Sequence, residues 1–585
     1  MEGRIYTIEE KCTGCNKCIS ICPVDCANQV YRAYDDTRKG VVEHEYCIAC
    51  GACLSVCDHQ ARGYLDDTER FFRDLAAGEA IHVVAAPSAQ LHFPELPRLF
   101  GWLKSLGARK FYDVSLGADI CTWAYLKARK HLSLPSMIAQ PCSSIVNYCE
   151  RYLPELLPYL APIQSPLLCL AIYMRQREGL KEKLAFLSPC ISKAEEIEDA
   201  NTGNLVQYNV TFSKLQQKIR EEGIDLAKYP PLEFDGMPSG IGHVYSRPGG
   251  LGETVRVTEQ DLWLRQVDSV PFSYPYLREY LERVRQGKPV PEIVDILNCA
   301  GGCNFGTGTD RSVAQDDIDQ RTNRKKRDKE AVQITKKQEQ TIYAVQEHFD
   351  RVLRWEDFRR EYTDRKVENG QFEDEDLEEV FRFLHKHSEE ARNINCHACG
   401  YGSCKRFAQA IKLGMNIPET CIDYDRSQLK FDFLTSLLNH GGLGDVLERF
   451  LRINRRAQQT LSVIMMDVDD FKHVNDRYGH DVGDAALIAV AQAISKHTRP
   501  GDAAGRWGGD EFMILLPNTC REDAIEIARN IQHDILSSDI LPEGGRFSSS
   551  AGIAEALPKD TPLALFQRAD RELYKAKQHK EKHLR

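Results

Sequence analysis

SVIMMDVDDFKHVNDRYGHDVGD, residues 462–484, and GRWGGDEFMILL, residues 505–516, are the two stretches that decide the fold of the C-terminal part of the chain. The apolar run at residues 461–466 predicts a buried β-strand, and Asp467 lies at its end. In the second stretch, Gly508 and Gly509 have no side chains, so the backbone there can approach a ligand closely. Carboxylate oxygens such as those of Asp467 and Glu511 are the ligands that a hard cation such as Mg²⁺ prefers.

Both stretches resemble the GGDEF family of diguanylate cyclases, and the resemblance covers residues 430–585. It implies an α+β domain of the palm, or nucleotidyl cyclase-like, type. It also implies a reaction in which two GTP form cyclic di-GMP: a 3′-hydroxyl attacks an α-phosphorus and pyrophosphate leaves. Mg²⁺ neutralises the phosphates in such a transfer. One GGDEF domain binds one GTP, so the resemblance implies a homodimer.

The resemblance assigns the metal and the chemistry to four residues. Asp467, Val468 and Glu511 match the metal-binding positions of the family. Asp510 matches the position thought to help deprotonate the 3′-hydroxyl, so Asp467, Asp510 and Glu511 are the expected catalytic residues.

The nucleotide contacts are also assigned by the resemblance. Asn475 and Asp484 match the pair that binds the guanine edge. An amide and a carboxylate fit the acceptor and donor groups of guanine. Lys577 matches a phosphate-binding lysine. The remaining expected nucleotide-binding residues are Lys472, Gly508 and Gly509.

A product-inhibition site and two departures complete this part of the sequence. Arg499 and Asp502 match the RxxD site at which an arginine forks onto phosphate or guanine of cyclic di-GMP. The family's arginine pair after LTSLLN is replaced by His440 and Gly441. Glu581 stands where a second phosphate-binding arginine is usual, and Lys580 or Lys582 are candidates to compensate for it.

The N-terminal part, residues 1–65, holds two cysteine runs with C-x2-C-x2-C-x3-C spacing among the 21 cysteines of the chain. In a cytosolic chain, such clusters indicate metal ligands rather than disulfides. The twice-repeated run is the bacterial ferredoxin pattern, in which the fourth cysteine of each run crosses to the other cluster. Two zinc sites would not require this crossed repeat. The predicted [4Fe-4S] ligand sets are Cys12, Cys15, Cys18 and Cys57, and Cys47, Cys50, Cys53 and Cys22.

Residues 80–310 alternate strand-like apolar runs with helical stretches, which predicts an α/β architecture. VAAPSAQ, AQPCSSIVNYCERYLPELLP, LSPCISKAEE and DILNCAGGCNFGTG resemble the catalytic domain of [FeFe]-hydrogenases, in family order. The resemblance implies an H-cluster in which Cys303 bridges a cubane to a two-iron unit. Lys193 matches the lysine that hydrogen-bonds one cyanide, and Pro87 and Ser88 match the loop at the other. The implied cubane ligands are Cys142, Cys190, Cys299 and Cys303.

This region also departs from active hydrogenases. Pro141 replaces the proton-carrying cysteine beside Cys142, which removes the first acid of the proton route. Ser188 and Leu297 replace methionines, and Asp295 stands where a relay glutamate is usual. This combination resembles the sensory members of the family. Three readings stay open: a full H-cluster that senses hydrogen, a cubane alone that reports redox state, and a scaffold without a cluster.

Two further segments separate these regions. Residues 311–388 are charged with helically spaced apolar residues, which predicts a helical linker that spaces or orients the domains. Residues 389–425 resemble a small helical four-cysteine [4Fe-4S] domain, with zinc as the alternative metal. Its expected ligands are Cys396, Cys399, Cys404 and Cys421.

Composition limits the classes of function. The net charge of −10 argues against general nucleic-acid binding. The chain shows no signal peptide and no apolar stretch long enough to span a bilayer as a helix, so we expect a soluble, cytoplasmic protein without membrane insertion.

The sequence as a whole predicts a multidomain protein that combines α/β and α+β domains. We expect a diguanylate cyclase regulated by upstream iron–sulfur domains, with GTP as substrate, cyclic di-GMP as product and feedback inhibitor, and H₂ or a redox protein as an input partner. The alternatives are a hydrogenase with a regulatory GGDEF tail, and a cyclic di-GMP receptor with a degenerate cyclase.

Overall fold

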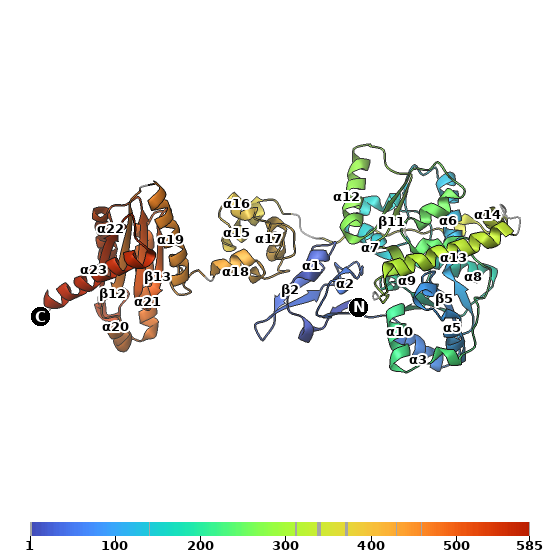
Figure 1. Ribbon diagram of the computed structural model, residues 1–585, viewed down its shortest axis with the longest axis horizontal. Coiled ribbons are helices and arrows are strands. Elements are labelled where there is room, and N and C mark those ends of the chain that lie inside the picture. The colour runs from blue at the N-terminus through green and yellow to red at the C-terminus, as the bar shows by residue number, and fades with distance from the viewer. Residues whose placement is uncertain are drawn as a thin grey trace. The chain divides into compact units, whose positions relative to one another are not determined.

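A computed structural model describes residues 3–139, 141–310, 313–335, 341–368, 372–428, 430–457 and 459–583 (Figure 1). The chain divides into two units, Met1–Ile417 and Pro418–Arg585. The expected four-cysteine domain at residues 389–425 contains the boundary between them, so Cys421 belongs to the second unit.

The cysteine-rich N-terminal part is built on two short antiparallel pairings. β1 (Ile5–Thr7) pairs with β4 (Arg62–Tyr64), and β2 (Asn28–Arg32) pairs with β3 (Arg38–Val42). Each cysteine run passes through a short helix, α1 (Lys17–Ile21) or α2 (Ala52–Ser55). The β1–β4 pairing returns the chain after Cys57 to its beginning, which brings the end of the second run back toward the first.

Two parallel sheets form the centre of the first unit, as expected for an α/β region. The larger has the order β6–β5–β8–β9 and the smaller has the order β10–β11–β7. Parallel strands require crossovers, which helices provide here. The strands are β5 (Ile81–Ala85), β6 (Phe111–Asp113), β7 (Met137–Ile138), β8 (Lys183–Ser188), β9 (Tyr208–Thr211), β10 (Leu264–Val267) and β11 (Ile293–Ile296).

The helices of this region cover both sheets (Figure 1). The longest of them, α6, lies close to α8, and Gly117 permits the contact because a Cβ there would lie 2.0 Å from the carbonyl oxygen of Pro166. The helices are α3 (Thr68–Ala76), α4 (Ala89–His92), α5 (Leu96–Ser105), α6 (Val114–His131), α7 (Ser143–Tyr152), α8 (Pro166–Arg177), α9 (Lys193–Glu198), α10 (Phe212–Glu221), α11 (Gly250–Arg256) and α12 (Val270–Arg285).

Residues 311–388, the predicted charged helical linker that spaces or orients the domains, contribute to a core in their central part. The segment is helical where expected, in α13 (Gln315–Thr335) and α14 (Thr341–Val352). Phe349, Trp355 and Phe358, however, belong to the same hydrophobic core as the larger parallel sheet. The indole N–H of Trp123 also donates to Asp350 Oδ1 at 2.7 Å. We call residues 355–367 the strap, because they run across the first unit after α14.

The last elements of the first unit form a small apolar cluster of their own. α15 (Glu378–Phe383) packs against α17 (Cys404–Lys412) through Leu377, Phe381 and Ala408. α16 (Glu389–Arg392) lies between them in sequence. Residues 377–383 therefore pack with the four-cysteine segment rather than forming part of a free linker.

The second unit is a four-stranded antiparallel sheet of order β13–β14–β12–β15, flanked by helices. The central strand β12 is buried on both faces: Ile464 and Met466 pack in one core, and Val463 and Met465 in another. This explains why its sequence is continuously apolar, and it confirms the predicted strand and the α+β class. The strands are β12 (Leu461–Val468), β13 (Ala503–Gly508), β14 (Glu511–Pro517) and β15 (Ser549–Glu555).

The helices of the second unit are α18 (Ile422–Gln428), α19 (His440–Ala457), α20 (Phe471–Tyr478), α21 (His480–His497), α22 (Arg521–Leu536) and α23 (Pro562–His583). α19 and α23 cover one face of the sheet, and α21 and α22 cover the other. Over the described residues of the whole chain, no helix combines the length and apolar character needed to cross a membrane.

Candidate functional site

The two expected metal-binding carboxylates lie side by side on neighbouring strands of the second unit. Asp467 on β12 is the register partner of Glu511 on β14. Residues directly opposed in an antiparallel pair have Cβ atoms about 5 Å apart and point to the same face. The backbone N–H of Val468 donates to the carbonyl of Asp510 at 3.2 Å, which holds the loop carrying Asp510 against β12.

The electrostatics of this pair suit a bound cation. Burial raises the pKa of Asp467, and the nearby carboxylates of Asp510 and Asp469 raise it further. Lys577 opposes this effect, with its Nζ 2.6 Å from Asp467 Oδ1. Burial also raises the pKa of Glu511, followed by the charges of Asp467 and Asp510. Carboxylates that repel one another in a half-buried site are stabilised by a divalent cation, so the donor set fits Mg²⁺.

Asp469 is a further carboxylate that the sequence analysis did not single out. It accepts hydrogen bonds from Ser548 Oγ at 2.7 Å and Ser550 Oγ at 2.6 Å, and it pairs with Lys580. Lys580, a candidate to compensate for Glu581, is thus engaged with Asp469 and Ser548. The side chains of Glu581 and Lys582 lie outside the described residues. The signal for Asp469 was its place two residues after Asp467, within the same acidic run.

The expected guanine pair lies around the turn from α20 to α21. Asn475 is on α20 and Asp484 is on α21, where its side chain is exposed. Gly483 makes room for Asn475, since a Cβ at Gly483 would lie 1.9 Å from the amide oxygen. That oxygen is buried and has no hydrogen-bond partner among the described residues, as expected of a group that binds a ligand. Lys472, at the start of α20, is exposed.

The glycine turn adjoins the metal pair. The register between β13 and β14 shifts between Arg506 and Gly508, and Gly508 lies opposite Glu511. A Cβ on Gly508 would lie 3.4 Å from Glu511 Oε2, whereas one on Gly509 would meet nothing within 4 Å. Gly509 therefore leaves open space beside the expected metal site.

The structure also describes the RxxD pair, Arg499 and Asp502, and His440, which replaces an arginine of the family pattern. Arg499 Nε lies 3.2 Å from Asp502 Oδ1, and its Nη2 donates to Thr519 Oγ1 at 2.8 Å. The guanidinium is therefore held in one orientation before any ligand binds. His440, at a position that departs from the family pattern, packs against Trp507 with the two rings tilted by 41° and their centroids 3.9 Å apart.

In the first unit, four strands end at one cavity. Pro87 and Ser88 follow β5, Cys190 follows β8, Cys142 follows β7 and Cys299 follows β11. Carboxyl ends of parallel strands are where α/β folds place their ligands. All four expected cubane ligands line this cavity, together with Lys193, Pro87 and Ser88: Cys142, Cys190, Cys299 and Cys303.

The chemistry of the lining fits an iron–sulfur group. Burial raises the pKa of the Cys190 thiol to about 12, with Cys299 and Cys142 adding to the shift, and it raises that of Cys303 well above its usual range. Neighbouring buried cysteines of this kind are held as thiolates when a cation such as iron binds them. The hydroxyls of Ser88 and Ser143 are buried with no hydrogen-bond partner among the described residues, so the cavity also offers polar groups to a ligand.

The structure brings the cysteines of each expected N-terminal ligand set near one another. Cys12, Cys15, Cys18 and Cys57 line one cavity. In the other expected set, burial raises the pKa of the Cys22, Cys50 and Cys53 thiols, and neighbours within the set add to each shift. Burial is also the main cause of the raised pKa of Cys47.

This second set adjoins the hydrogenase-like cavity. Asn298, which lines the cavity beside Cys299, donates to the carbonyl of Cys50 at 3.2 Å.

Arg62, which the sequence analysis missed, donates to Cys18 Sγ at 3.1 Å. The only signal for Arg62 in the sequence was its place five residues after Cys57.

Cys396, Cys399 and Cys404 lie in the first unit and Cys421 in the second, so the structure does not place the four relative to one another. Within the first unit, Arg406 forks onto Asp25, with Nε 2.9 Å from Oδ2, and this joins the four-cysteine segment to the N-terminal part.

Four family models match the chain. "4Fe-4S dicluster domain" matches residues 4–58 and "Iron only hydrogenase large subunit, C-terminal domain" matches residues 79–307. "Putative Fe-S cluster" matches residues 393–422, and "Diguanylate cyclase, GGDEF domain" matches residues 429–583. The chain is a fusion of hydrogenase-like iron–sulfur domains with a GGDEF domain.

The fusion protein is similar to curated diguanylate cyclases in its C-terminal part. Diguanylate cyclase DgcM of Escherichia coli strain K12 is 37% identical over 148 residues, 25% of this chain and 35% of that protein. Diguanylate cyclase TpbB of Pseudomonas aeruginosa is 40% identical over 154 residues, 26% of this chain and 35% of that protein. The fusion protein thus spans about a third of the length of these relatives.

Among solved structures, the GGDEF domain of DgcB from Caulobacter crescentus in complex with c-di-GMP is 28% identical. The match covers 26% of this chain and 91% of that chain, with a TM-score of 0.25.

Proposed function

We propose that the fusion protein is a diguanylate cyclase that converts two GTP into cyclic di-GMP under the control of its iron–sulfur domains. The observation that carries the proposal is the register pairing of Asp467 with Glu511, with Lys577 on Asp467. This arrangement supports a carboxylate pair that holds Mg²⁺ beside an open glycine turn. The similarity of residues 429–583 to curated diguanylate cyclases supports the same reaction.

The residues divide the work by their chemistry. Asp467 and Glu511, with the backbone of Val468, would hold Mg²⁺, which supplies neutralisation of the phosphate charge. Asp510 would accept the proton of the attacking 3′-hydroxyl. Lys577 balances Asp467 before metal binds and would contact phosphate afterwards. Asn475 and Asp484 would bind guanine, with Lys472 as an exposed cation close to the nucleotide.

The reaction joins two nucleotides, and one domain holds one of them. A second copy of the chain must therefore face the first, so we propose a homodimer as the active form. Control of how the two copies meet would then control the rate.

The first test is synthesis by the purified full chain under anaerobic conditions with GTP and Mg²⁺. The wild type should form cyclic di-GMP in at least one redox state. Glu511→Gln should abolish synthesis and keep the fold, because it removes a metal-binding charge. Glu526→Gln, an exposed glutamate on α22, is the matched control. Absence of product from the wild type in both the oxidised and the reduced state would overturn the proposal.

We also propose that the first unit holds [4Fe-4S] clusters in both N-terminal ligand sets and a full H-cluster in the cavity. The hydroxyls of Ser88 and Ser143, which are buried without a hydrogen-bond partner among the described residues, support a polar group in addition to a cubane. The infrared spectrum of anaerobically matured protein tests this: CO and CN stretches are expected. Their absence would leave the reading in which a cubane alone reports redox state.

Product inhibition is the last part of the proposal. Because Asp502 and Thr519 already orient Arg499, its fork is arranged to bind a phosphate or guanine edge. Arg499→Ala should raise the concentration of cyclic di-GMP needed to slow synthesis at least tenfold, since it removes a charge-assisted fork worth about 1.5–3 kcal/mol. An unchanged inhibition constant would contradict this assignment.

A further inference from the structure

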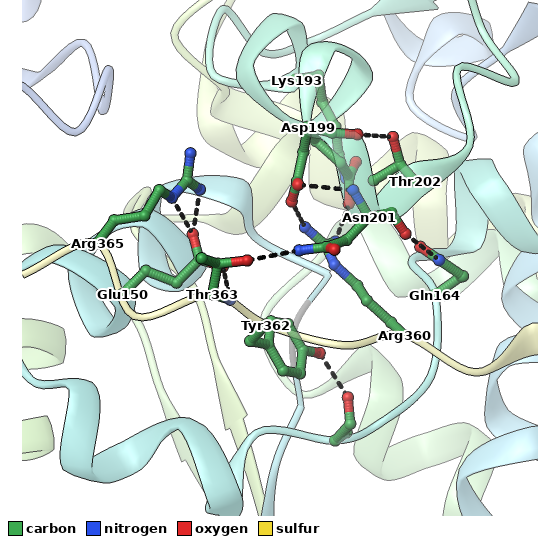
Figure 2. A network of polar contacts seen from close by, with 12 residues as sticks. Glu150, Gln164, Lys193, Asp199, Asn201, Thr202, Arg360, Tyr362, Thr363 and Arg365 are labelled. Atoms are coloured by element: carbon green, nitrogen blue, oxygen red, sulfur yellow. Dashed lines mark hydrogen bonds and ion pairs between the residues drawn. The ribbon is translucent and has the colours of Figure 1, made fainter.

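A buried chain of alternating charges links the strap to Lys193, which lines the hydrogenase-like cavity. Its two ends, Arg360 and Lys193, are labelled in Figure 2. Arg360, on the strap, places Nη1 3.0 Å from Glu196 Oε1 and Nη2 2.9 Å from Asp199 Oδ2. The other carboxylate oxygen of Glu196 accepts from Lys193 Nζ. The side chains of Arg360 and Glu196 are 2% and 1% exposed, so neither charge is screened by solvent.

Lys193 is the end of this chain that faces the cavity. It lines the cavity with the four cysteines, and it begins α9, three residues after Cys190. Burial dominates the raised pKa values of the Cys190 and Cys303 thiols, and the Lys193 cation opposes that effect at both. The ammonium group is therefore close enough to act on charge held by these sulfurs.

The strap has a second anchor, on α7. Glu150, which is completely buried on α7, accepts from the backbone N–H of Thr363 at 3.0 Å and from Arg365 Nε at 3.0 Å (Figure 2). α7 begins directly after Cys142, as α9 begins shortly after Cys190. The strap thus binds both α7, which follows Cys142, and α9, which follows Cys190.

The contact of Arg360 with Glu196 sets how much positive charge Lys193 presents at the cavity wall. Glu196 has two buried cations, and without Arg360 its full negative charge would act on Lys193 alone and draw the ammonium toward itself. With Arg360 present, Glu196 is shared, and Lys193 remains a net positive charge at the cavity wall. A purely structural role would predict an effect on stability and none on the contents of the cavity.

We propose that Arg360 is a positioning residue for the cavity: from the strap it fixes Glu196, and Glu196 fixes the Lys193 ammonium against the bound cluster. This inference rests on the cubane assigned to the cavity under the proposed function, and it does not depend on cyclase activity. A cluster gains negative charge on reduction, so a nearby buried cation raises its reduction potential and a nearby carboxylate lowers it.

The experiment is a redox titration of the full chain, reconstituted with iron and sulfide and followed by electron paramagnetic resonance. Cys303→Ser identifies the component that belongs to the cavity, because it removes one of that cluster's ligands alone. Arg360→Gln should lower the midpoint potential of that component, and Glu196→Gln should raise it. Arg360→Lys, which keeps the charge, should restore most of the shift. Arg359→Gln, a change at the exposed neighbouring arginine, should shift nothing.

A double variant separates positioning through Glu196 from direct action of the Arg360 charge. If the effect passes through Glu196, Arg360→Gln should cause a smaller shift in the Glu196→Gln background than in the wild type. An equal shift in both backgrounds would overturn the proposal, as would the same potential in Arg360→Gln and Arg359→Gln. If Arg360→Gln does not fold, Glu196→Gln and Arg360→Lys decide the question.

The failures of the two proposals are distinguishable. A titration with no Cys303-dependent component would overturn both the cavity cluster and the role of Arg360. If the cyclase is inactive but the midpoint potential of the Cys303-dependent component shifts as expected in the variants, only the proposed synthesis of cyclic di-GMP is overturned.

Discussion

Lys577 balances the charge of the metal-binding pair, and it gives a prediction at the scale of a single residue. Its Nζ lies 2.6 Å from Asp467 Oδ1. Lys577→Ala should raise KM for GTP roughly tenfold, because one charge-assisted phosphate contact is worth about 1.5 kcal/mol. Lys575→Ala, on the same helix and paired with Glu572, is the control. Steady-state kinetics measure both, and equal KM values would contradict the role.

Asp295 gives a second prediction at this scale, about pH. Burial raises the pKa of Asp295 to about 7, whereas the carboxyl has its ordinary low value when the chain unfolds. Between about pH 4 and pH 7 the folded state therefore holds a proton that the unfolded state has released. The free energy of unfolding of the first unit should fall as pH rises through this window, by about 1.4 kcal/mol per pH unit at most.

Asp295→Asn removes this titration and should flatten the dependence on pH. Anaerobic denaturant unfolding of the first unit at pH 5 and pH 8 checks it. Asp261→Asn, at an exposed aspartate of the same region, should keep the slope of the wild type. A wild-type stability that rises from pH 5 to pH 7 at this site would show that the buried carboxyl is ionised.

At the scale of an element, the strap is part of the first unit's core. Phe358 is fully buried and packs near Trp123, with ring centroids 6.3 Å apart. Phe358→Ala should destabilise the first unit by about 3–5 kcal/mol, the usual cost of emptying a buried phenylalanine site. Phe383→Ala, at a side chain 53% exposed, should cost less than about 1 kcal/mol. Thermal unfolding of both variants makes the comparison, and a small effect of Phe358→Ala would mean that the strap is not structural.

At the scale of the whole molecule, the two units have separate cores and should unfold separately. Removal of iron by a chelator should lower the midpoint of the first unit's thermal transition, because buried thiols lose the cations that favour their close approach. The transition of the GGDEF domain should remain. GTP with Mg²⁺ should raise only the second transition, since it binds only there. A single transition that shifts with both treatments would contradict independent units.

Much of each site could be predicted from sequence because its chemistry is local. The spacing of the cysteine runs, the apolar run before Asp467 and the glycine pair before Asp510 are each contained within a few residues. Asp469 and Arg62 were missed because a place near Asp467 or Cys57 does not by itself say which groups a side chain contacts. Their roles come from Ser548, Ser550 and Cys18, which lie far away in sequence.

The amino-acid sequence by itself determined which residues carry chemistry and which short segments become strands, because spacing and hydrophobic periodicity are properties of neighbouring residues. Only the tertiary structure decided that residues 355–367 form a strap. Their charged composition indicated a linker, and Trp355 and Phe358 bury in a core built mostly from elements more than a hundred residues away. The tertiary structure alone also decided the link from Arg360 through Glu196 to Lys193, since pairing between distant charges depends on the fold that brings them together.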